Sequence, residues 1–80
     1  MRARVTITLK PGVLDPQGKA IEGALAGLGF GGVTAARQGK VIDLDLAARD
    51  EAAAREEVAA MCEALLANTV VERYDIAIEG

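Results

Sequence analysis

The sequence predicts a small α+β domain in which strands and helices follow one another in the order βαββαβ. Three observations support this order. Three segments alternate apolar with polar residues, two others carry apolar stripes at helical spacing, and glycine or proline stands at several of the boundaries between elements. The chain has 80 residues, enough for one domain and too few for two. We therefore expect residues 1–80 to form a single domain.

The first strand is predicted from Ala3 to Lys10, where apolar and polar residues alternate. A period of two with β-branched side chains is typical of a half-buried strand, here with Val5, Ile7 and Leu9 on one face. Pro11-Gly12 ends the strand, because proline has no N–H for the ladder and glycine permits a tight turn.

A first helix is predicted next. Asp15 is placed to cap its start, and Pro16 fits the first helical position, where its missing N–H costs nothing. Gly29 supplies the C-terminal stop. The apolar stripe of this helix consists of Ile21, Ala24, Leu25 and Leu28.

Two strands are then expected as a hairpin, at Val33–Arg37 and Val41–Leu46, joined across Gln38-Gly39-Lys40. The second strand alternates apolar with acidic residues. Its inward side chains are expected to be Ile42, Leu44 and Leu46, with Asp43 and Asp45 facing water.

The second helix is predicted from about Glu51 to Ala67, with Asp50 as its cap. A last strand follows from Val70 to Ile78. The helix stripe consists of Ala54, Val58, Met61, Cys62 and Leu65, and the inward residues of the strand are Tyr74, Ile76 and Ile78.

This element order predicts the ferredoxin-like arrangement. Right-handed crossovers would place both helices on one face of a four-stranded antiparallel sheet with strand order 4-1-3-2. The other face would carry no helix, and it could meet either solvent or a second copy of the chain.

The composition favours association with a partner. A chain of this length has a thin stability margin and usually gains a disulfide, a metal or a partner. Cys62 is the only cysteine, histidine is absent, and the aromatic residues are Phe30 and Tyr74. An intrachain disulfide or a Cys/His zinc site is therefore excluded, and partnering remains.

The charge balance excludes other classes of function. A net charge of −3 argues against nucleic-acid binding, which requires a basic face. No apolar run approaches the roughly 20 residues that span a bilayer, and the N-terminus does not resemble a signal peptide. We expect a cytoplasmic protein with a reduced thiol and no contact with membrane or nucleic acid.

No catalytic, cofactor-binding or metal-binding residue is expected. Cys62 lies on an apolar stripe and is interpreted as a buried structural thiol. Asp43 and Asp45 could share a face and hold a cation, but solvated charge is preferred. The glycines at 27–32 follow a helix, whereas a dinucleotide-binding motif follows a strand.

Two surface segments, residues 10–19 and 65–74, are more apolar than a turn requires. Val13 and Leu14 stand side by side before the first helix, and Leu66 and Val71 fall outside the predicted stripes. Apolar residues outside a core indicate interfaces.

Several sequence blocks resemble the PurS family, the small subunit of phosphoribosylformylglycinamidine synthase. The resemblance extends over nearly the whole chain, with one departure: PurS proteins commonly carry proline where this sequence has Thr69. The blocks are Val13–Lys19, Leu28-Gly29-Phe30, Gly39-Lys40, Cys62-Glu63, Leu65–Asn68, Glu72 and Tyr74.

The resemblance implies a non-catalytic subunit in purine biosynthesis that forms a homodimer or homotetramer. It would bridge a synthetase subunit, which uses ATP and magnesium, and a glutaminase subunit, which releases ammonia from glutamine. Together they convert formylglycinamide ribonucleotide to its amidine. This chain itself would hold no cofactor. Shielding matters because free ammonia becomes protonated and diffuses away.

Partner contacts are expected at nine residues. The first group lies at the entrance of the first helix and would contact the synthetase: Leu14, Asp15, Gln17 and Lys19. The second group is Arg37, Lys40, Asn68, Glu72 and Tyr74.

Three alternatives share the same element order. A regulatory module of ACT type would bind amino acids at a dimer interface, with Pro11-Gly12 in its binding loop. An acylphosphatase-like enzyme would need an arginine in the loop 11–17, which has none. An RNA-binding module would need aromatic residues exposed on its central strands.

Overall fold

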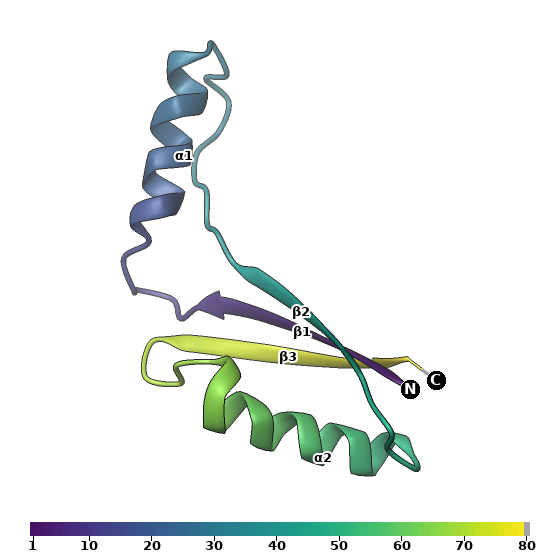
Figure 1. The fold of residues 1–80 in the computed structure, drawn as a ribbon. Coiled ribbons are helices and arrows are strands. Elements are labelled where there is room, and N and C mark those ends of the chain that lie inside the picture. Colours follow the sequence, from purple (N-terminus) through teal and green to yellow (C-terminus); the bar gives the residue numbers. More distant parts are fainter. Residues whose placement is uncertain (80) are drawn as a thin grey trace.

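A computed structural model of the chain describes residues 1–79 (Figure 1). Its elements alternate between strand and helix. They are β1 (Arg2–Leu9), α1 (Pro16–Gly27), β2 (Lys40–Asp45), α2 (Glu51–Met61), a π-helical turn (Cys62–Leu66) and β3 (Glu72–Glu79).

The three strands form one antiparallel sheet with β1 in the centre, in the order β2-β1-β3. The register places Val5 opposite both Ile42 and Ile76. Helix α2 lies along one face of this sheet (Figure 1) and packs on β1 and β3. The expected α+β class is confirmed, and so is the expected order of these three strands.

The four-stranded sheet was a wrong expectation. Residues 33–39 form no strand, so the hairpin at Val33–Arg37 and Val41–Leu46 does not exist and the order is βαβαβ. The segment instead runs back beside α1 (Figure 1). The side chain of Arg37 donates to carbonyl groups at the end of β1 and in the loop between β1 and α1.

The placement of both helices on one face was also wrong. Helix α1 projects beyond the end of the sheet (Figure 1). Three strands spaced about 4.8 Å apart span about 10 Å, which is the width of a single helix. Helix α2 alone therefore fills that face. We call α1 and the returning segment, residues 16–39, the arm.

The caps expected from the sequence are confirmed. Asp15 and Asp50 cap α1 and α2, and Pro16 occupies the first turn of α1. Gly29 has a φ of +96°, a left-handed conformation that glycine adopts without steric cost. These short-range signals fix where each helix begins and where α1 ends.

The core is small and lies between the sheet and α2. Val5 and Ile7 of β1 meet Val58 and Cys62, all at most 1% exposed. The inward side chains expected on β2 and β3 pack around this centre, which confirms them. They are Ile42, Leu44, Leu46, Tyr74, Ile76 and Ile78.

The π-helical turn changes which leucine reaches the core. The N–H of Ala67 donates to the Cys62 carbonyl five residues earlier, at 3.0 Å, and this wider turn rotates the following side chains. Leu65 is 84% exposed, whereas Leu66 packs against the core. The expectation that placed Leu65 inside the stripe and Leu66 outside it was wrong.

The face of the sheet opposite α2 is charged. Arg4 pairs with Asp43 at 2.8 Å and Arg2 with Asp45 at 3.2 Å. The two aspartates therefore form exposed ion pairs with arginines of the neighbouring strand. Within residues 1–79 no group of acidic or cysteine side chains is arranged to hold a metal ion.

The chain is elongated, measuring 50 × 26 × 15 Å with a radius of gyration of 16.0 Å. A compact chain of this length has a radius of gyration of about 12 Å. The difference comes from the arm, which extends away from the sheet (Figure 1). Among the described residues, no helix is long and apolar enough to cross a membrane.

Candidate functional site at the base of the arm

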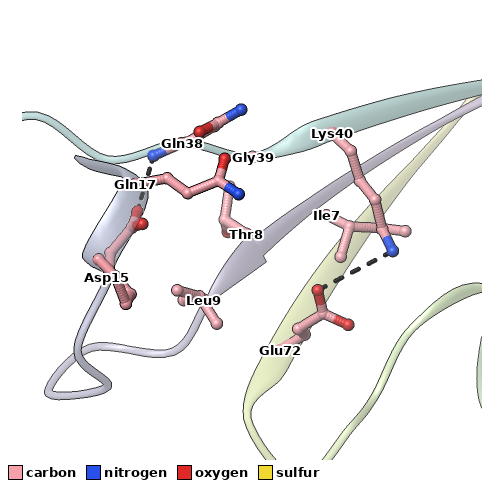
Figure 2. Close-up of a pocket in the computed structure, with 10 residues that line it drawn as sticks. Ile7, Thr8, Leu9, Asp15, Gln17, Gln38, Gly39, Lys40 and Glu72 are labelled. Carbon is pink, nitrogen blue, oxygen red and sulfur yellow. Dashed lines mark hydrogen bonds and ion pairs between the residues drawn. The ribbon is translucent and has the colours of Figure 1, made fainter. Parts of the chain in front are cut away.

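The structure brings most of the expected contact residues to the base of the arm, where it joins the sheet. A first cavity of about 360 Å³ is lined by Asp15, Gln17, Lys40 and Glu72 (Figure 2). A second, of about 290 Å³, is lined by residues that include Leu14, Lys19 and Arg37. Asp15 lies in both.

Asp15 is buried at this junction, with 6% of its surface exposed. Its Oδ1 accepts the N–H of Gly18 at 2.9 Å, and its Oδ2 accepts the N–H of Gln38 at 2.8 Å (Figure 2). These bonds, the one from Gly18 foremost, lower the pKa of the carboxyl group. Both oxygens of Asp15 are thus occupied within the chain.

Arg37 binds the loop that leads from β1 into α1. Its guanidinium donates to the carbonyl of Val13 at 3.0 Å and to those of Leu9 and Lys10 at 3.4 and 3.3 Å. A planar fork of N–H donors suits such a cluster of carbonyl groups. The side chain therefore ties the returning segment of the arm to the end of β1.

Two glycines, Gly18 and Gly39, allow two backbone segments to approach each other closely at the base of the arm. A Cβ on Gly18 would overlap the carbonyl of Ala36. A Cβ on Gly39 would lie 2.7 Å from the carbonyl oxygen of Ile7, closer than Cβ atoms come. Gly39 was expected to serve a hairpin turn, and the structure gives it this packing role instead.

An ion pair joins two residues that line the first cavity. Nζ of Lys40 lies 4.0 Å from a Glu72 carboxylate oxygen (Figure 2). The other oxygen of Glu72 accepts the N–H of Asn68 at 2.6 Å. The strand register explains the meeting, because Lys40 stands opposite Ile7 and Glu72 opposite Leu9. The expected strand order already placed both strands beside β1, and the pair depends in addition on this register.

The other expected contact residues differ in their surroundings. Leu14 is 73% exposed, and Lys19, also exposed, pairs loosely with Glu22 at 3.7 Å. Asn68 holds the turn before β3 by accepting the N–H of Val70 at 3.2 Å. Tyr74 packs on the core beside Glu63, whose carboxylate raises the pKa of the phenol.

Thr8 and Gln38 also line the first cavity (Figure 2), and the sequence had given no reason to select them. Both are ordinary polar residues, and only the position of the arm brings them together. The Cys62 thiol lies in the core and lines neither cavity, and burial raises its pKa.

The fold and the site define a class of small α+β proteins in which a narrow sheet carries a protruding apolar arm. The family model described as PurS, phosphoribosylformylglycinamidine (FGAM) synthase, matches residues 2–80. The chain belongs to the PurS family.

Similar proteins of other organisms carry the name of the same family. PurS of Synechocystis is 51% identical over 71 residues, covering 89% of this chain and 71% of the relative. PurS of Mycobacterium leprae is 45% identical over 79 residues, covering 99% and 96%.

Solved structures show the same fold. PurS of Methanocaldococcus jannaschii matches with a TM-score of 0.90 at 44% identity, covering 98% of this chain and 94% of that chain. Bacillus subtilis PurS gives 0.90 at 39%, covering 99% and 98%. A chain in the structure of PurLQS from Thermotoga maritima gives 0.87 at 34%, covering 95% and 93%.

Proposed function

We propose that this PurS subunit is non-catalytic and joins the synthetase and glutaminase subunits of FGAM synthase, so that ammonia passes between them without escaping to water. The Thermotoga maritima relative supports the proposal, because its structure is that of PurLQS. ATP and magnesium would be bound by the synthetase, and this chain would contribute contact surface only. The complex would work in the cytoplasm.

The arm is the observation that carries this proposal. It exposes apolar side chains with few charges among them, and such a surface is stabilised when a partner covers it. The exposed large apolar residues of the arm are Ile21, Leu28, Phe30 and Val33. A homodimer or homotetramer would cover part of this surface, and the larger subunits the rest.

The residues around the entrance of α1 are proposed contacts with the synthetase. Leu14, Gln17 and Lys19 carry exposed side chains there. Asp15 belongs to the same group, but its carboxylate is taken up inside the chain, so it would act through the shape of the entrance. The second group of proposed partner contacts consists of Arg37, Lys40, Asn68, Glu72 and Tyr74.

Reconstitution tests the proposal. The synthetase and glutaminase are assayed for amidine formation with and without this chain, once with glutamine and once with ammonium chloride as the nitrogen source. We expect the chain to be required with glutamine and dispensable with a high concentration of ammonium. Glutamine-dependent synthesis that proceeds equally well without the chain would contradict the proposed function.

A further inference from the structure

We propose that Asp15 and Arg37 are positioning residues that together lock the direction in which the arm projects from the sheet. The lock itself is a property of this chain. Its importance for assembly rests on the proposed function, so the two parts have separate tests.

The direction of the arm depends on its base. Helix α1 makes no extensive packing contact with the strands or with α2, and Gly18 is its only buried residue. A helix of 12 residues is about 18 Å long, so a rotation of about 10° at the base would move its tip by about 3 Å. Contacts at the base must therefore set where the apolar surface lies.

Asp15 links the two halves of the arm through one carboxylate. Its Oδ1 holds Gly18 in the first turn of α1, and its Oδ2 holds Gln38 just before β2. An N-cap needs only one of these bonds. The second bond joins the outgoing helix to the returning segment, which gives Asp15 a role that a cap alone would not explain.

Arg37 closes the same junction from the side of β1. It stands next to Gln38 and donates to carbonyl groups of Leu9, Lys10 and Val13. The end of β1, the start of α1 and the segment before β2 are thus joined in a ring that hydrogen bonds and the backbone close together. The close approach of Gly18 to the Ala36 carbonyl leaves little room for this ring to shift.

Asp15→Asn separates the cap from the lock. Asparagine caps a helix as well as aspartate does, so its side-chain oxygen can still accept the N–H of Gly18. Its amide group, however, would present a donor to the N–H of Gln38, where Oδ2 now accepts. Asp50→Asn is the matched control, because the structure gives the Asp50 side chain one backbone partner, Ala53.

The first test measures the direction of the arm in the full chain. Nitroxide labels are attached to Ala26→Cys near the end of α1 and Thr6→Cys on the sheet, both exposed positions, while Cys62 is buried. Labelled chains are diluted with unlabelled ones, and the intrachain distance distribution is recorded. We expect at least a twofold broader distribution with Asp15→Asn or Arg37→Met, and an unchanged one with Asp50→Asn. Unchanged widths in both arm variants would overturn the lock.

The second test measures assembly with the unlabelled variants. Asp15→Asn should bind the synthetase–glutaminase pair at least tenfold more weakly than the wild type, while the variant remains folded at the temperature of the binding assay. Wild-type affinity despite a broadened distribution would show that arm direction does not matter for assembly. A wild-type chain that fails to bind would instead contradict the proposed function, while the distance measurement still decides the lock.

Discussion

The carboxyl group of Asp15 gives the fold a dependence on acid pH. Its pKa in the folded chain lies below the ordinary value because it accepts two backbone N–H groups. Its stabilising effect is therefore complete above the unfolded value of about 3.9 and is lost as the pH falls through the lower folded value. The positive charge of Arg37 lowers this pKa further.

We predict that wild-type stability falls as the pH drops below about 4 and that Asp15→Asn reduces this loss. Asp43, whose pKa is lowered by its bond with Arg4, contributes in the same direction, so Asp43→Asn serves as a parallel variant. Denaturant unfolding curves between pH 2 and pH 6 measure the effect. Identical acid slopes for the wild type and Asp15→Asn would contradict it.

Cys62 offers a second prediction for a single side chain. The thiol is fully buried against Ile7 and Val58, and burial raises its pKa, so both access and thiolate formation are suppressed. We expect negligible reaction with a disulfide reagent in the folded chain and full reaction in denaturant. Cys62→Ser should cost about 1–3 kcal/mol, because its hydroxyl would lack a partner. Rapid labelling of the native chain would contradict this.

At the scale of elements, the π-helical turn predicts unequal roles for two neighbouring leucines. Leu66→Ala should lower the free energy of unfolding by about 1–2 kcal/mol, because the side chain packs on the core. Leu65→Ala should change it by less than about 0.5 kcal/mol, since Leu65 is 84% exposed. Denaturant titration measures both, and the reverse order would show that the helix continues without a wide turn.

Sequence patterns predicted those elements whose signals are local. The period of two in β1 and the caps at Asp15 and Asp50 depend on neighbouring residues only, and the structure confirms them. The segment Val33–Arg37 also has strand-like residues, but a strand forms only where another strand pairs with it. Arg37 binds the opposite loop instead, and no short-range pattern shows such a contact.

The candidate site was predictable in part for the same reason. Leu14 and Lys19 were selected because their block is too apolar and too specific for a turn, and both are exposed. Their contact with a partner stays a prediction. The meeting of Lys40 with Glu72 depends on the register of β2 and β3 against β1. The burial of Asp15 depends on the return of the chain to Gln38. Contacts between residues over twenty positions apart leave no periodic trace in the sequence.

At the scale of the whole molecule, the shape divides the surface into two kinds. The open face of the sheet carries arginine–aspartate pairs, which are well solvated and gain little from burial. The arm carries apolar side chains without a covering element. Four of the eight exposed large apolar side chains of the described residues lie on the arm, and association should depend on this surface.

Leu28→Lys tests this division. Leu28 is 73% exposed at the end of α1, so a lysine there should change the stability of the isolated fold by less than about 0.5 kcal/mol. A charge on the apolar surface should nevertheless weaken association at least tenfold, because a partner would have to desolvate it.

Light scattering after size exclusion measures self-association, and co-purification measures binding to the larger subunits. Val41→Lys, at a 59% exposed position on the charged face, is the control and should associate normally. If Leu28→Lys associated as the wild type does, the arm would not be the docking surface.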